Sequence, residues 1–207
     1  MTLSRQTSPR VVPGVEREAE LELIARLKAG DEAAFDAIYD AFNTRLFNFL
    51  ARLIRNRQQA EDLLEETWLR LVTHAGRLQP DTKLAPWLFT VARNLYASHC
   101  RSRMLEEAYA ADGIGLWPAA PAVSPFEQTA ANQLEARVEA ALARLPPIYR
   151  EVVLLVVVEG LEPAEAAGIC GVTAAAMRQR LKRARDLLAQ SIEIDRTCPA
   201  VLREVKI

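Results

Sequence analysis

The residues best suited to bind another molecule form a run of cations near the carboxyl end of the chain. Between Thr173 and Arg185 there are five basic side chains and no acid. Cations this close together repel one another, and nucleic-acid phosphates would neutralise them. The run therefore predicts a nucleic-acid surface rather than a merely solvated face. Its candidate contacts are Arg178, Gln179, Arg180, Lys182, Arg183 and Arg185.

A glycine-containing turn precedes these cations and predicts a helix-turn-helix. Cys170-Gly171-Val172-Thr173 separates a short apolar helix from a long helix that begins at Ala174. The long helix has an apolar stripe made of Met177, Leu181, Ala184 and Leu188. The cations lie opposite that stripe, and small residues at the helix start would let its backbone approach a DNA major groove.

A second basic region is interleaved with aromatic rings. The segment 82–105 contains no acid but includes Lys83, Arg93, Arg101 and Arg103, beside Trp87, Phe89 and Tyr96. Cations beside rings suit unpaired, single-stranded bases. Rings at helical spacing also suit a hydrophobic core, so this pattern alone leaves base stacking and packing open.

An acidic face lies upstream of this region. Glu61, Asp62, Glu65 and Glu66 fall away from an apolar stripe of Leu63, Leu64, Trp68 and Leu71. Such a face is usually only solvated. The alternative is that it docks on a basic protein partner.

Catalysis, metal binding and cofactor binding are not indicated. No nucleophile–base pair, metal-ligand cluster or phosphate-binding glycine loop occurs, so we expect no enzyme, no catalytic residue and no cofactor. Cys100, Cys170 and Cys198 are dispersed, which argues against zinc and disulfides and favours a reducing cytoplasm. His74 and His99 are isolated, so structural or exposed roles outweigh metal ligation.

The elements that would position these groups are all predicted to be helices. Aromatic residues make up only 6% of the chain, and no strand-like alternation occurs. Helices are expected from Glu16 to Gly30, from an N-cap at Asp31, beyond Asn56, from Pro86 to about Arg103, and over 126–145, 148–159, 163–170 and 174–190. The longest apolar run, Val152–Val158, is too short for a membrane span, and no signal peptide is recognised.

A break in helical patterning divides the chain into two small domains. Glycines and prolines punctuate the stretch between Tyr109 and Pro125, which reads as an interdomain linker. Trp117 within it is either a local anchor or a contact point. The predicted organisation is a flexible leader (1–15), a first helical domain (16–106), the linker (107–126), a helix-turn-helix domain (127–191) and a tail (192–207).

Several of these segments, in this order, resemble the extracytoplasmic-function (group IV) sigma factors of bacterial RNA polymerase. Ala60–Leu71 resembles the segment that binds the polymerase clamp helices, and Pro86–Leu95 resembles the helix that faces the melted minus-10 element. Leu145–Leu154, Glu159–Leu161 and the helix-turn-helix resemble the domain that binds the minus-35 element. The resemblance covers roughly residues 20–105 and 127–190.

The resemblance implies a role for each surface. Asp62, Glu65 and Glu66 would contact polymerase core. Melted minus-10 DNA would be held by Asp81, Thr82, Lys83, Trp87, Arg93 and Asn94, and the cations of the long helix would bind the minus-35 duplex. It also implies an anti-sigma protein as a partner and a cytoplasmic protein without membrane insertion.

Two other readings compete with a sigma factor. A polymerase-independent helix-turn-helix regulator would explain residues 127–190 but would leave the acidic face and the first basic region without a purpose. A pure protein-interaction adaptor with a degenerate DNA domain would need a recognition face without cations, and this face has them.

Overall fold

Every element of the described chain is helical. The computed structural model describes residues 13–110 and 133–197, and no strand occurs among them. The elements are α1 (Pro13–Lys28), α2 (Glu32–Ile54), α3 (Arg57–His74), the 3-10 turn η1 (Ala75–Arg77), α4 (Leu84–Ala110), α5 (Gln133–Arg144), α6 (Pro147–Val153), the π-helix η2 (Leu154–Val158), α7 (Pro163–Cys170) and α8 (Ala174–Thr197). The all-α prediction is confirmed. Trp117, the first twelve residues, most of the predicted linker and the last ten residues lie outside the described residues.

Helix boundaries follow local capping chemistry. Asp31 accepts a hydrogen bond from the backbone N–H of Ala33 at 2.9 Å, so its predicted N-cap role for α2 is confirmed. Asn56 caps α3 in the same way, through a 3.1 Å bond from the N–H of Gln59. Gly30 follows α1 with a φ of +81°, a left-handed conformation that glycine adopts without a Cβ clash.

Two helices, α4 and α8, run further than the sequence predicted, and α4 also begins elsewhere. α4 continues to Ala110 rather than ending near Arg103, because residues 104–110 are helix formers with no glycine or proline before Gly113. α8 continues to Thr197 for the same reason. α4 also begins at Leu84, which places Pro86 in its first turn, where a missing N–H is tolerated.

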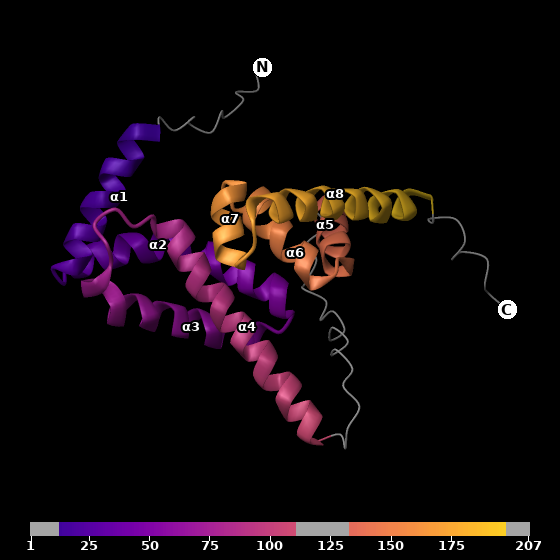
Figure 1. Ribbon diagram of the computed structural model, residues 1–207, viewed down its shortest axis with the longest axis horizontal. Helices are drawn as coiled ribbons and strands as arrows, with labels where there is room; N and C mark the ends of the chain where they lie inside the picture. Colours follow the sequence, from indigo (N-terminus) through magenta and orange to yellow (C-terminus); the bar gives the residue numbers. More distant parts are fainter. Residues whose placement is uncertain (1–12, 111–132, 198–207) are drawn as a thin grey trace.

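The amino-terminal half is a bundle of α1 to α4. α2 packs against both α3 and α4, and α1 lies across α2 and η1 (Figure 1). The fully buried side chains of this bundle include Ile38, Leu46, Phe49, Leu50, Leu71, Leu88 and Phe89. Fully burying a large apolar side chain contributes about 1.5–3 kcal/mol, so this core holds the acidic face and the second basic region in place.

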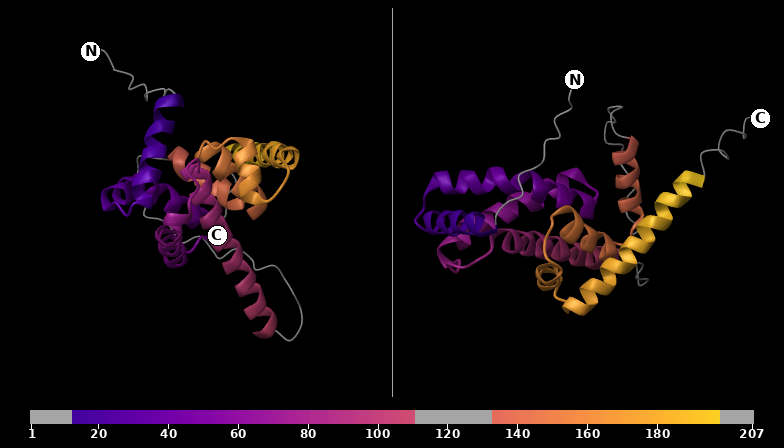
Figure 2. Two further views of the ribbon diagram at one scale, coloured as in Figure 1. Left: turned by 60° about the vertical axis from the view of Figure 1, so that its left-hand side comes forward. Right: turned by 90° about the horizontal axis from the view of Figure 1, so that it is seen from above.

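The carboxyl-terminal half consists of α5 to α8 and lies beside the bundle. α8 packs on α5, α6 and α7, while the far end of α4 projects away from the body (Figures 1 and 2). Leu142, Leu145, Val153 and Ala184 form a small core of this half. α6 passes directly into the π-helix η2, whose Leu154 and Leu155 are fully buried.

The larger hydrophobic core crosses the boundary between the two halves. It joins the bundle residues to Val152, Leu155 and Ala166, which α6, η2 and α7 supply. α7 packs against α4, and α6 contacts α2. The two halves are therefore closely packed in this structure, although the sequence pattern indicated only that each is helical.

No helix among residues 13–110 and 133–197 is both long and apolar enough to cross a membrane.

Candidate nucleic-acid interface

The predicted helix-turn-helix is formed by α7, a three-residue turn and α8. Gly171 ends α7 with a φ of +64°, and the N–H of Val172 donates to the carbonyl of Ala167 at 2.9 Å. Thr173 Oγ1 then accepts from the N–H of Ala176 at 3.1 Å, which is the N-cap that the sequence predicted for α8. These contacts fix the direction in which α8 leaves the turn.

The apolar stripe of α8 lies inward and its polar face lies outward. Met177, Leu181 and Ala184 are buried, and Leu188 is half-buried, as the sequence predicted. The side chains of Arg178, Gln179, Lys182, Arg183 and Arg185 are exposed, and Arg180 is half-buried. Within the part of the chain that the structure describes, none of these cations forms an ion pair, so they are available to an anionic partner.

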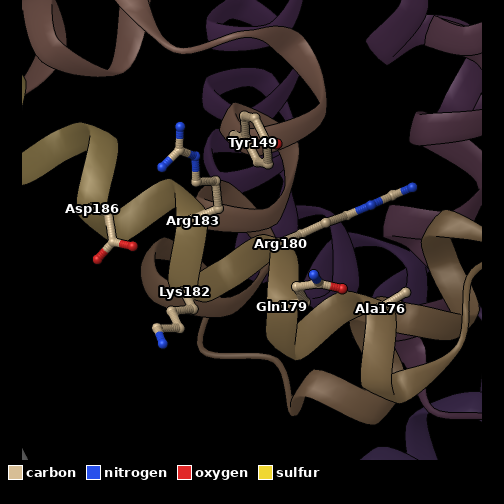
Figure 3. A pocket seen from close by; sticks show the side chains of 7 residues that line it. All are labelled: Tyr149, Ala176, Gln179, Arg180, Lys182, Arg183 and Asp186. Atoms are coloured by element: carbon tan, nitrogen blue, oxygen red, sulfur yellow. The ribbon is translucent and has the colours of Figure 1, made fainter.

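Successive turns of α8 line an open concavity of about 450 Å³ (Figure 3). Its lining residues are Tyr149, Ala176, Gln179, Arg180, Lys182, Arg183 and Asp186. Arg183 extends toward Tyr149, and the side chain of Lys182 points away from it (Figure 3). Donors directed to different sides along one helix suit simultaneous contact with base edges and phosphates in a major groove.

The second predicted DNA surface consists of the loop before α4 and the first half of α4. Asp81 and Lys83 are exposed in the loop, and Thr82 is half-buried. On α4, Asn94 is exposed, whereas Trp87 and Arg93 are half-buried. The structure therefore brings all six predicted contacts to one loop–helix segment.

The aromatic rings of this segment have different environments. Phe89 is fully buried and packs edge-on against Phe49, with ring centroids 5.2 Å apart, so Phe89 belongs to the core. Trp87 and Tyr96 are half-buried and pack against the same core. Burial raises the pKa of the Tyr96 phenol, which stays protonated.

Four ion pairs connect the two halves with one polarity. The cation comes from the amino-terminal half and the carboxylate from the carboxyl-terminal half in every pair. The pairs are Arg45–Glu159 (2.9 Å), Arg52–Glu139 (2.6 Å), Lys83–Glu165 (2.6 Å) and Arg93–Glu151 (2.8 Å). Two predicted DNA contacts, Lys83 and Arg93, are thus paired with carboxylates of the other half.

These pairs differ in how well solvent reaches them. The Lys83 side chain is exposed, and its hydrogen bond to Glu165 raises the pKa of Lys83. Exposed ion pairs contribute little to stability and are screened by salt. Glu159 is nearly inaccessible, and burial raises its pKa despite the Arg45 guanidinium. The Lys83–Glu165 pair is therefore more accessible to solvent than the Arg45–Glu159 pair.

The predicted acidic face lies on α3. Asp62 and Glu65 are exposed, and Glu66 is half-buried beside Arg70, with 2.8 Å between Glu66 Oε1 and Arg70 Nε. Leu69 and Val72, which were not among the predicted contacts, are 57% and 55% exposed on the same helix. Both residues follow Glu65 at positions i+4 and i+7, and this helical spacing could have placed them on the same face as Glu65. Exposed apolar patches rimmed by polar residues mark protein-interaction sites.

Arg150 was also missed, although it lay inside a motif that the sequence analysis used. It is only 3% exposed and donates to carbonyls at the ends of two helices. Its partners are Leu142, Ala143 and Leu145 at the end of α5 (3.0, 2.8 and 2.9 Å), and Arg52 and Leu53 on α2 (3.3 and 3.5 Å). Burial and the nearby Arg55 lower the pKa of the Arg150 guanidinium. The α-helix ends leave carbonyls unpaired, and one guanidinium satisfies several of them.

The cysteines provide a first testable prediction. Cys170 is 6% exposed, and burial raises the pKa of its thiol to about 12, so the reactive thiolate is scarce at neutral pH. Cys170 in the folded protein should resist alkylation by iodoacetamide and become reactive on unfolding, as measured by mass spectrometry. Serine at both Cys170 and Cys100 should retain promoter activity.

The matching control for this prediction is the metal content of the purified chain. No group of three potential metal ligands occurs within residues 13–110 and 133–197, and Cys198 lies outside them. A stoichiometric zinc ion, or fast alkylation of native Cys170, would contradict the assignment of a structural thiol.

Comparison with protein families matches two segments of the chain. Residues 38–105 match the model described as sigma-70 region 2, and residues 135–188 match sigma-70, region 4. The first segment contains the acidic face and the loop–helix surface, and the second contains the helix-turn-helix.

Individual relatives match across both segments. The chain is 33% identical to the RNA polymerase sigma factor CarQ of Myxococcus xanthus, over 80% of this chain and 92% of CarQ. It is 37% identical to the ECF RNA polymerase sigma factor EcfG of Rhodopseudomonas palustris, over 71% of this chain and 78% of EcfG. Among solved structures, CnrH in complex with the cytosolic domain of CnrY has a similar fold, with a TM-score of 0.62 and 23% identity over 86% of this chain and 99% of that one.

Proposed function

Because the chain belongs to the extracytoplasmic-function family of RNA polymerase sigma factors, it directs polymerase to promoters, and we propose that its two basic surfaces divide promoter recognition between them. The observation that carries this proposal is the separation of the surfaces. The exposed cations of α8 lie on one half, and the Asp81–Lys83 loop with α4 lies on the other.

The α8 surface would bind duplex DNA at the minus-35 element. Gln179 and Arg183 are exposed on the polar face and line the concavity, so they can reach base edges. Arg178, Lys182 and Arg185 would neutralise phosphates, and half-buried Arg180 would support the same strand contacts.

The loop–helix surface would hold the melted minus-10 element. Asp81, Thr82 and Lys83 would surround an unpaired base, while Arg93 and Asn94 would contact the strand along α4 and Trp87 would border it. Lys83 and Arg93 would have to exchange Glu165 and Glu151 for phosphates. DNA binding at this surface would therefore separate α7 from α4.

Polymerase core would hold the two halves apart at a fixed spacing. Each DNA surface then acts at a high effective concentration once the other is engaged, so two weak contacts give one stable complex. The chain would contribute binding and positioning without chemistry of its own, and it would act in the cytoplasm, where polymerase is found.

A second protein partner is proposed by analogy with solved neighbours. CnrH was solved with the cytosolic domain of CnrY, and RpoE of Bartonella quintana was solved with the anti-sigma factor NepR (TM-score 0.56, 24% identity over 89% of this chain). We propose that an anti-sigma protein likewise binds this chain and prevents it from engaging polymerase.

Run-off transcription with core polymerase tests the function directly. The purified chain should direct specific transcripts from genomic fragments only when core polymerase is present, and should co-elute with core in gel filtration. DNA binding and regulation without co-elution would instead identify a polymerase-independent helix-turn-helix regulator.

Charge reversal on α3 tests whether the acidic face binds core polymerase. Asp62→Lys with Glu66→Lys should weaken binding to core polymerase at least tenfold, because the two carboxylates would no longer attract a basic partner surface. Surface substitutions usually change the free energy of unfolding by about half a kcal/mol or less, so the fold should persist. Affinity is measured by fluorescence anisotropy with labelled chain.

The matched control places the same charge change on α1. Glu18→Lys with Glu22→Lys alters two exposed acids outside the docking face and should leave polymerase affinity unchanged. If both double variants bind equally well, the α3 face is not the docking site.

A further inference from the structure

α1 is attached to the main chain of the loop that precedes α4. Arg17 donates to the carbonyl of Asp81 and, at 3.0 Å, to the carbonyl of Thr82. Glu20 Oε1 accepts from the N–H of Leu84 at 2.6 Å. Lys28 Nζ donates to the carbonyl of Leu78 at 2.6 Å. The helix thus contacts the loop backbone before, within and after the three residues proposed to surround an unpaired base.

These contacts do not involve the loop side chains. All four bonds go to backbone groups, while the side chains of Asp81 and Lys83 remain exposed. The loop has little internal support of its own, with one backbone hydrogen bond from Thr82 to Gln79 at 3.1 Å. Without α1, water would satisfy these carbonyls and the loop would be free to adopt other conformations.

Glu20 also substitutes for a missing cap. Leu84 is the first residue of α4, and Lys83 before it has no side-chain oxygen that could accept from the first turn. The Glu20 carboxylate supplies both the acceptor and a negative charge at the positive end of the helix. A residue of α1 therefore caps the start of α4.

α1 is itself fixed to the bundle. Ile24 is fully buried and Leu27 nearly so, one and two turns after Glu20. Arg17 and Glu20 also form an ion pair with each other, which holds both side chains toward the loop. Neither residue lies within the 38–105 segment matched as sigma-70 region 2.

We propose that Arg17 and Glu20 are positioning residues that hold the Gln79–Lys83 loop in the shape that captures an unpaired promoter base. This inference rests on the proposed role of the loop. Preorganisation lowers the entropy that is lost when the base binds, so its removal should weaken capture without altering any direct contact.

The experiment uses the full chain with core polymerase. Arg17→Ala and Glu20→Ala should each lower transcription from an intact duplex promoter about tenfold, and the defect should shrink on a template already melted around the start site. Polymerase affinity should stay within twofold of the unsubstituted chain. Arg17→Lys, which keeps one donor to the loop, should recover part of the activity.

Arg26→Ala and Glu22→Ala are the matched controls. Arg26 pairs with Asp31 on the exposed side of α1, and Glu22 is exposed, so both variants should behave as the unsubstituted chain. Equal activity of Arg17→Ala and Arg26→Ala would overturn the inference. So would an Arg17→Ala defect that is the same on duplex and pre-melted templates, because that pattern indicates general damage.

Direct substitution of the loop separates this inference from the function on which it depends. If Asp81→Ala and Lys83→Ala impair duplex transcription and Arg17→Ala does not, only the positioning role fails. If the loop variants are also fully active, the assignment of the loop to base capture fails.

Discussion

Alanine at both Gln179 and Arg183 should lower transcription from a linear duplex promoter by roughly 10–100-fold or more. Both side chains are exposed on the polar face of α8, and loss of a good base contact costs about 1–3 kcal/mol. The buried stripe of Met177 and Leu181 is untouched, so the helix should remain folded. Run-off transcription, with circular dichroism as the check on folding, measures the effect.

The template distinguishes this defect from one in the loop. A template already melted around the start site should not restore upstream binding to the Gln179 and Arg183 variant. Variants in the Asp81–Lys83 loop should recover on it, because the cost of unstacking a base, a few kcal/mol, has already been met. An identical response of the two groups to pre-melting would show that the division between two DNA surfaces is wrong.

Methionine at Arg150 should destabilise the folded chain by roughly 3–5 kcal/mol. The guanidinium is almost inaccessible, and hydrogen bonds to charged groups contribute about 1.5–3 kcal/mol each, less than additively. Its loss removes the side-chain donor of the Ala143 and Leu145 carbonyls at the end of α5 and of the Arg52 carbonyl on α2. Since whole domains are stable by only about 5–15 kcal/mol, thermal unfolding should show a large decrease in the transition midpoint.

Two further variants test whether the loss of stability comes from the buried Arg150 guanidinium. Arg150→Lys keeps the charge but cannot reach both helix ends, and should fall between the methionine variant and the unsubstituted chain. Arg185→Met removes an exposed arginine from α8 and should change the midpoint little. Equal midpoints for Arg150→Met and Arg185→Met would show that the buried guanidinium contributes nothing to stability.

Features set by neighbouring residues could be predicted from the sequence. The N-caps at Asp31 and Thr173 follow from short-range chemistry, as do the turn at Gly171 and the inward stripe of α8, and the structure confirms each of them. The exposure of the α8 cations followed from the same periodicity. Helix ends could be predicted less well from the sequence, because strong helix formers beyond Arg103 allow α4 to continue without a stop signal.

Features that depend on residues far apart in the chain could not be predicted from the sequence. The bonds of Arg17 to the loop span more than sixty positions, and those of Arg150 to α2 span nearly a hundred. No periodicity encodes such contacts, since each depends on how helices are placed in three dimensions. The pairing of Lys83 and Arg93 with carboxylates was missed for the same reason, although the DNA-facing candidates themselves were named.

The uniform polarity of the four ion pairs has a consequence for self-association. Two copies that met through this face with two-fold symmetry would place cations against cations or carboxylates against carboxylates, so an isologous dimer through it is disfavoured. Reciprocal domain exchange is different, because the amino-terminal half of one copy would meet the carboxyl-terminal half of another with every pair preserved. At high protein concentration, the same four ion pairs that hold the two halves of one chain together could therefore form between the halves of two chains.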